Sequence, residues 1–181
     1  MTGVPTCALP ISIFLKTGNL LKGKYLAELT KELFDRVESS SKKSEYRISI
    51  YGKSRKEWSE LAAWIKRFNV RSPSNRWLIQ VPRIYGALRQ QNAVTNFQSL
   101  LDNVFEPLFA VTENPRSDPE LAEFLNDVSG FDSVDDESRN DLRLEKELPD
   151  PLTWTQEANP PYMYYMYFMY RNISLLNQAR K

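Results

Sequence analysis

Helical and extended patterns alternate along this sequence, and that order constrains the fold more than any other feature. Apolar residues recur at intervals of three and four over 19–40, 54–70 and 93–109, as one face of an amphipathic helix requires. Strand-like segments lie at 45–52, 76–85 and 128–134, and Pro82 is expected to end the hydrogen-bonded ladder of the second because it has no backbone donor. The first two begin about thirty residues apart, enough for one helical crossover between parallel strands. The order predicts an α/β fold with a parallel sheet.

Particular residues predict where the elements begin and end. Ser54 is placed to cap the second helix, and Asp118 followed by Pro119 is typical of a helix start. Pro107 is expected to bend or end the helix at 93–109, because proline lacks a backbone donor. The buried face of the first helix is expected to be a stripe with a spacing of four, with Leu26 and Phe34 beside it: Leu21, Tyr25, Leu29, Leu33 and Val37.

A run of tyrosine and methionine near the end of the sequence predicts one more helix. It can begin at Asn159 or Pro160 and is apolar around nearly its whole circumference through Tyr170, which favours a helix buried on all sides. The alternative, a base-stacking platform for single-stranded nucleic acid, needs a basic groove beside it. The net charge is +1, so neither nucleic acid nor an anionic membrane is an expected partner.

The scarcity of metal and nucleophile chemistry narrows the function. The chain has no histidine and one cysteine, Cys7, so histidine-dependent nucleophile constellations and the usual zinc ligand sets are not available within it. A single cysteine also excludes an intrachain disulfide and suits a reducing compartment such as the cytoplasm. The alternative is a site of Asp and Glu oxygens for magnesium or calcium within 130–138, although that segment lacks the midway glycine and the closing bidentate Glu of a calcium loop. We expect this chain to bind no metal of its own.

The carboxyl ends of the predicted strands are the expected place for a ligand site, as in other parallel α/β folds. They bring together Tyr51–Gly52, Pro82–Arg83 and the acidic end of "GFDSVDDES", residues 130–138. Alternation places Asp132 on the face opposite Phe131, where a buried carboxylate needs a cation such as Arg47, Arg76 or Arg83. Two interpretations stay open: a solvated turn or a functional site. The substrate-binding candidates are Arg83, Asp132, Asp135 and Asp136.

Several separated blocks resemble, in order and spacing, the central part of eukaryotic AMP deaminases. These blocks are "FLKTGNLLKGKYLAEL", "EYRISIYGKSRKEWSELAAWI", "WLIQVPRIY", "NFQSLLDNVFEPLFAVTENP", "GFDSVDDES" and "NPPYMYYMYFMYRNISLLNQAR". The resemblance covers residues 13–181. Residues 1–12 instead resemble the translation of a sequencing-library adapter, so we expect them to lie outside the fold and Cys7 to have no function.

The resemblance implies a partial (β/α)8 barrel, strands two to four with their helices. The intact family is expected to hydrolyse AMP to IMP and ammonia with a zinc-activated water, and to form homo-oligomers. Its zinc-binding histidines, its aspartate ligand and its catalytic glutamate and histidine match no position of this chain. The resemblance extends to related purine deaminases, in which the matching segment lies against the purine. It implies that a main-chain amide near Asp135 contacts the purine ring.

Three hypotheses about the function of this chain stay open. The first is a segment of AMP deaminase that is inactive alone, because zinc lowers the pKa of its water only when the ligands hold the metal. The second is a non-catalytic fragment that associates with an intact barrel enzyme through its sheet edges. The third is an unrelated small α/β nucleotide-binding protein.

Overall fold

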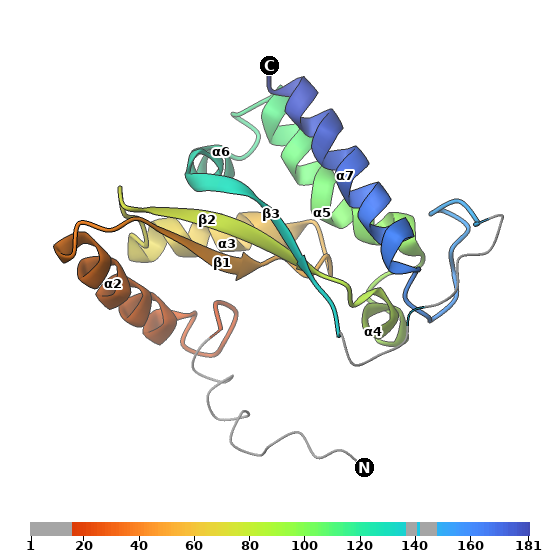
Figure 1. The fold of residues 1–181 in the computed structure, drawn as a ribbon, viewed down its shortest axis with the longest axis horizontal. Helices are drawn as coiled ribbons and strands as arrows, with labels where there is room; N and C mark the ends of the chain where they lie inside the picture. The colour runs from red at the N-terminus through yellow and green to blue at the C-terminus, as the bar shows by residue number, and fades with distance from the viewer. Residues whose placement is uncertain (1–15, 137–140, 142–147) are drawn as a thin grey trace, which may run out of the picture.

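The centre of the computed structural model, which describes residues 16–136, 141 and 148–181, is a three-stranded parallel sheet (Figure 1). Its strands are β1 (Ser44–Ser49), β2 (Asn75–Pro82) and β3 (Val128–Val134), in the order β1-β2-β3. Both pairings are parallel, with Ile79 beside Ile48 on one side and Phe131 on the other. This confirms the predicted α/β fold with a parallel sheet.

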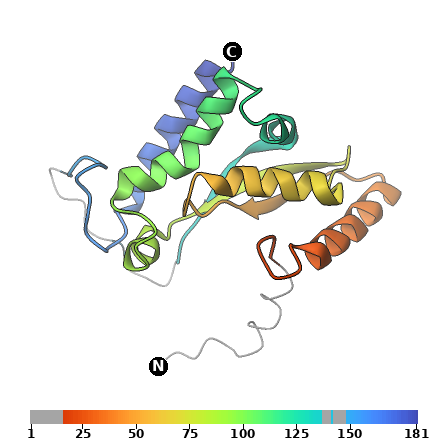
Figure 2. The same cartoon turned by 180° about the vertical axis from the view of Figure 1, so that it is seen from behind.

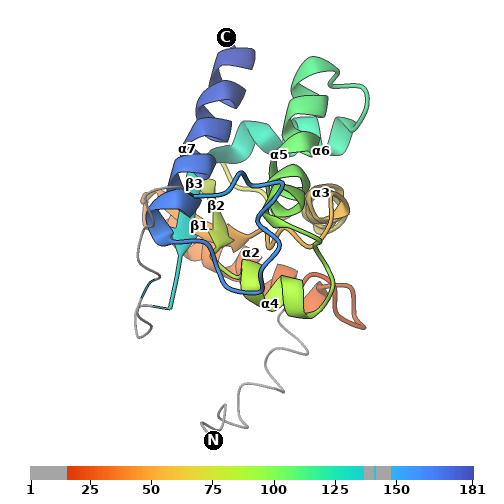
Figure 3. The same ribbon diagram turned by 90° about the vertical axis from the view of Figure 1, so that its right-hand side faces the viewer.

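Within the described residues, one helix precedes the sheet, five helical segments connect its strands, and one helix follows it. They are α2 (Lys24–Ser39), α3 (Lys56–Phe68), α4 (Tyr85–Gln90), α5 (Phe97–Glu113), α6 (Pro119–Phe124), a short 3-10 turn η1 (Leu125–Asp127) and α7 (Tyr162–Ala179). Seen from behind, α3 lies in front of the sheet (Figure 2). Helices α5 and α7 run alongside each other and pack together, in both this view and the view from the side (Figure 3).

The core lies between the sheet and its helices. The ring of Phe131, on β3, packs edge-on against Trp58 of α3 and contacts Phe105 of α5, with centroid separations of 6.4 and 6.0 Å. Nε1 of the fully buried Trp58 donates to the carbonyl of Val104, 2.8 Å away. The alternation of β3 therefore turns Phe131 towards the helices and Asp132 to the other face, which confirms that the two residues lie on opposite faces.

Helix α2 buries a different face from the one that its spacing predicted. Its buried residues are Ala27, Thr30 and Phe34, whereas Leu29 and Leu33 are nearly half exposed. The Phe34 ring stacks on Tyr46 of β1 at 6.0 Å, and this contact orients the helix. The four-spaced stripe was thus the wrong choice of buried face, because Tyr46 of β1 and Trp77 of β2 both pack against Phe34.

The predicted helix ends are partly confirmed. Oδ1 of Asp118 accepts from the amide of Leu121 at 3.0 Å, so Asp118 caps α6 with Pro119 at its first position. Ser54 makes no side-chain cap to α3; the Glu57 carboxylate instead turns back to accept the amides of Gly52 and Lys53. Helix α5 continues through Pro107 to Glu113, so the proline does not end it.

The second strand was predicted over 76–85 with its ladder ending at Pro82; the end at Pro82 is confirmed, and the extended conformation as far as Tyr85 is wrong. The strand ends at Pro82, which has no amide to continue the ladder, and Tyr85–Gln90 form α4 instead. The ring of Tyr85 is fully buried and its hydroxyl donates to the carbonyl of Trp154 at 2.9 Å. Burial of this ring under a distant segment, which local pattern does not reveal, favours the turn into a helix.

Helix α7 is buried on one face only, which corrects the prediction of burial on all sides. Tyr164, Tyr165, Met169 and Leu176 are buried, and Tyr164 and Tyr165 pack against Phe97 of α5. The opposite face exposes Met163, Tyr167 and Tyr170. None of the helices in the described part of the chain has both the length and the apolar character that crossing a bilayer requires.

Candidate functional site

Two of the four predicted site residues meet at the carboxyl edge of the sheet. Arg83 directly follows β2 and its amide donates to the carbonyl of Val134 at 2.9 Å, which extends the pairing past the last residue of the strand. Asp135 follows β3, and its carboxylate is bound by Nη1 of Arg83. The parallel register therefore brings Arg83 and Asp135 together, although 52 residues separate them in sequence.

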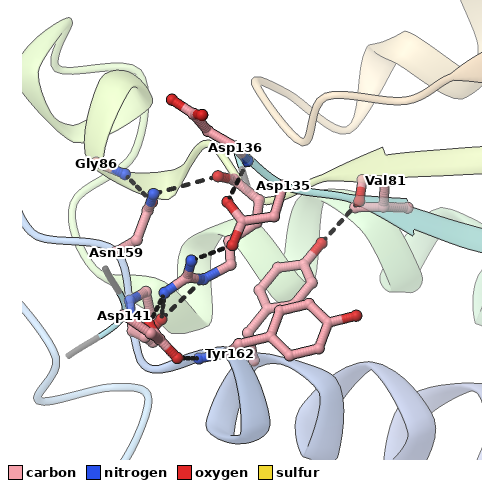
Figure 4. Close-up of polar contacts among 10 residues, drawn as sticks. Val81, Gly86, Asp135, Asp136, Asp141, Asn159 and Tyr162 are labelled. Atoms are coloured by element: carbon pink, nitrogen blue, oxygen red, sulfur yellow. Dashed lines mark hydrogen bonds and ion pairs between the residues drawn. The ribbon is translucent and has the colours of Figure 1, made fainter. Parts of the chain in front are cut away.

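Arg83 has further partners, which sequence reasoning missed. Its Nη2 donates to Asp141, and its Nε and Nη2 donate to the carbonyl of Pro160 at 3.0 and 2.7 Å. The other oxygen of Asp141 accepts the amide of Tyr162, the first residue of α7, at 2.7 Å (Figure 4). Asp141 and Pro160 lie in a region without periodicity, so no signal in the sequence links them to Arg83.

Asp136 lies beside this cluster and is exposed. Its amide donates to Oδ1 of Asp135 at 2.8 Å, so the Asp135 carboxylate joins its own following peptide to the Arg83 guanidinium (Figure 4). The arrangement orients the peptide between the two aspartates.

Asp132 belongs to a separate pair on the face of the sheet opposite Phe131. Its Oδ2 lies 2.5 Å from Nε of Arg47, so of the three arginines considered as its partner, Arg47 is the one. Hydrogen bonding to Arg47 holds the pKa of the Asp132 carboxyl below its ordinary value, against the effect of burial. Asp132 also lines a hollow of about 170 Å³ between β3 and α7, whose α7 side is Tyr162, Met166, Met169 and Ile173.

The segment that enters α7 is tied down over α4 and the start of α5. The side chain of Asn159 accepts the amide of Gly86 at 2.7 Å and donates to the carbonyl of Arg83 at 3.2 Å. The carbonyl of Trp154 accepts the amide of Phe97. These contacts fix residues 154–160 against the carboxyl end of β2, where Arg83 lies.

A groove of about 870 Å³ runs along β1 between α2, α3 and α4. Tyr51, Lys53 and Glu57 line the part that follows β1, and burial raises the pKa of the Glu57 carboxyl. Gly52, also predicted at the edge, is held by Asn103, whose Nδ2 donates to its carbonyl at 2.9 Å. None of the four predicted site residues lines this groove.

The residues that the structure describes do not form a zinc site. The chain has no histidine, and within the described ranges no three Cys, Asp or Glu side chains gather into a group able to hold a metal ion. Glu137 and residues 1–12, with Cys7, lie outside the residues that the structure describes.

Comparison with known proteins gives one consistent result. A family model described as AMP deaminase matches residues 8–181. The chain is 51% identical over 171 residues to an AMP deaminase of Schizosaccharomyces pombe, an alignment that covers 94% of this chain and 21% of that protein. It is 49% identical over 169 residues to the Saccharomyces cerevisiae AMP deaminase and 50% identical over 171 residues to AMP deaminase 3 of Mus musculus, each covering 93% of this chain and 21% and 22% of those proteins. The chain thus spans about a fifth of the length of these relatives.

Proposed function

The chain belongs to the AMP deaminase family, and from that premise we propose that it is a segment of the catalytic barrel of an enzyme that hydrolyses AMP to IMP and ammonia. Strands β1 to β3 are strands two to four of a (β/α)8 barrel in this proposal. The observation that carries it is a sheet of three consecutive parallel strands, joined through helices, in a chain about half identical to enzymes named for this activity.

The candidate substrate-binding segment is Asp135–Asp136. Arg83 binds the carboxylate of Asp135, and Asp132 lies three residues earlier, within β3. In parallel α/β folds, ligands bind beyond the carboxyl ends of the strands, and residues 135 and 136 follow directly from that end of β3. A neutral purine can be recognised there by main-chain groups, while the AMP phosphate needs cations. The zinc proposed for the whole enzyme is not held by the residues described here, so no step through the metal is assigned to them.

The test is a chimera in which this chain replaces the matching segment of the Schizosaccharomyces pombe enzyme. At 51% identity, the chimera is expected to release ammonia from AMP with kcat/KM within about tenfold of the parent, because cores tolerate exchanges that conserve volume and pattern. The isolated 181-residue chain, without histidine, is expected to release none. A chimera that folds, binds zinc and is inactive would contradict the proposal, as would activity of the isolated chain.

A non-catalytic fragment that associates with an intact enzyme is the second candidate. It is favoured by one observation: among the described strands, β1 and β3 pair only with β2, so the outer edge of each is open to another strand. Sedimentation of the isolated chain with the intact Schizosaccharomyces pombe enzyme distinguishes the two candidate functions. Co-sedimentation favours this second role, and its absence, together with an active chimera, favours the barrel segment.

A further inference from the structure

Arg83 holds together three parts of the chain that meet at the candidate site. Its guanidinium binds the carboxylate of Asp135 at the end of β3, the carboxylate of Asp141, and the carbonyl of Pro160 just before α7. The side chain of Arg83 is 8% exposed, against 24% for Asp135 and 39% for Asp141. The arginine is therefore the buried member of the cluster, and the carboxylates lie outside it.

The Asp135 carboxylate transmits this anchoring to the main chain. One of its oxygens binds Arg83 and the other accepts the amide of Asp136 at 2.8 Å. The direction of the peptide between Asp135 and Asp136 thus depends on where Arg83 holds the carboxylate. On the other side, Asp141 passes the same anchoring to the amide of Tyr162 and the first turn of α7.

Stability alone is a poor explanation of this arrangement. A buried charge cluster contributes little net stability compared with apolar packing of the same volume, because each charge loses its water. The planar guanidinium does, however, set several oxygens at fixed directions, which an apolar side chain cannot do. The place where it does so is the carboxyl edge of the sheet, where α/β proteins bind ligands.

The chain provides a matched comparison at the opposite edge. Arg71 precedes β2 and likewise binds two carboxylates, those of Glu123 and of Asp127, the residue before β3. It has the same chemistry at the amino ends of the strands. Arg71 is more exposed than Arg83, at 33% against 8%, so substitutions of the two are expected to differ in their effect on stability. Because ligand sites are not expected at the amino ends, a role in the site predicts a change in KM for Arg83 and none for Arg71.

We propose that Arg83 is a positioning residue: by holding Asp135, Asp141 and Pro160 together, it fixes how the Asp135–Asp136 segment meets the substrate. This inference rests on the proposed function, since it takes that segment to face AMP. Arg83 itself does not touch the substrate in this account.

The test uses Arg83→Lys and Arg71→Lys in the chimera with the yeast enzyme. Lysine keeps the charge but cannot reach three oxygens in fixed directions. Misplacing a binding segment weakens substrate and transition state alike, so Arg83→Lys is expected to raise KM for AMP about tenfold with kcat changed less than about threefold. Arg71→Lys is expected to leave KM within about twofold of the unsubstituted chimera. Equal effects of the two substitutions, or a lower apparent kcat at unchanged KM, would mean that Arg83 only stabilises the fold.

Asp141→Asn serves if Arg83→Lys does not fold, because it removes one charge from a more exposed partner and leaves the Asp135 contact in place. It is expected to raise KM about threefold, and an unchanged KM overturns the proposal. An inactive unsubstituted chimera instead counts against the proposed function.

A second measurement does not depend on activity. In the isolated chain, Arg83→Lys is expected to speed hydrogen exchange of the Asp136 and Tyr162 amides about tenfold relative to Arg71→Lys. Equal exchange in the two variants would show that Arg83 does not fix these groups.

Discussion

Nε of Arg47, on β1, lies 2.5 Å from Oδ2 of Asp132, on β3, so one ion pair reaches across the whole described sheet. The central strand takes part: hydrogen bonding to Gln80 also helps to keep Asp132 ionised. The pair lies on the face opposite the aromatic core, which makes it separable from the packing of Phe131.

The first prediction concerns the pH dependence of this pair. The pKa of Asp132 is lowered from its ordinary value of 3.8, so its contribution to stability is present above about pH 4 and is lost as the pH falls through the folded pKa. Arg47→Met is expected to lower the free energy of unfolding by under about 1 kcal/mol at pH 6, because Arg47 is well exposed. Urea unfolding at pH 6 and pH 3 should show the difference shrinking at the lower pH. An equal difference at both values would refute the assignment.

The second prediction uses two glycines. A Cβ on Gly86 would lie 2.5 Å from the carbonyl oxygen of Glu157, a backbone atom that cannot move alone. Gly86→Ala is therefore expected to cost about 1–3 kcal/mol of unfolding free energy. On Gly130 the nearest atom to an added Cβ is 3.6 Å away, an ordinary contact, so Gly130→Ala is the control and should change stability by less than about 1 kcal/mol. Urea denaturation checks both, and equal losses would contradict the close approach of residue 157.

The third prediction compares two tyrosines of α7. Tyr165 is fully buried and its hydroxyl donates to the carbonyl of Val81 at 2.9 Å, whereas Tyr167 is 55% exposed. Tyr165→Phe is expected to lower the free energy of unfolding by about 1–2 kcal/mol, because a buried carbonyl loses a donor. Tyr167→Phe should change it by less than about 0.5 kcal/mol. If thermal and urea unfolding gave the two variants the same stability, the assignment of the buried face of α7 would be wrong.

The fourth prediction concerns alkaline pH. Burial raises the pKa of Tyr164 from 10.0 to about 12, with the charge of Asp150 acting in the same direction. The unfolded chain therefore ionises this phenol first, and the associated stability, complete below pH 10, is lost as the pH rises towards about 12. Tyr164→Phe should make the free energy of unfolding fall less steeply between pH 10 and 11. Identical slopes for parent and variant would argue against a buried phenol; Tyr162→Phe, at the exposed start of α7, is the control.

The local predictions succeeded where a short stretch of chain decides its own conformation. Strand β3 lies at the predicted residues, and Asp118 with Pro119 begins α6, because alternation and capping depend on neighbours in sequence. The choice of buried face failed for α2 and α7. Their stripes contain more apolar residues than their partners cover, so the sequence alone could not show that Phe34 and Tyr165 point to the core while Leu29 and Tyr167 do not.

The candidate site divides in the same way. Its position is the carboxyl edge of the sheet, where Arg83 and Asp135 follow parallel strands. This position is a consequence of element order and could be predicted. The partners of its charges could not. Asp132 had three arginines to choose from, and Asp141 and Pro160 reach Arg83 from loops without periodicity.

The order of residues determined the helix-strand alternation and the meeting of strand ends, because both follow from local periodicity and from the geometry of parallel crossovers. Tertiary structure alone decided that Arg47 pairs with Asp132 and that Arg83 joins Asp135, Asp141 and Pro160. The physical reason is that these partners are far apart in sequence and meet only in the folded chain. A guanidinium selects its oxygens by distance and direction in space, and these are set only after sheet, loop and helix have packed.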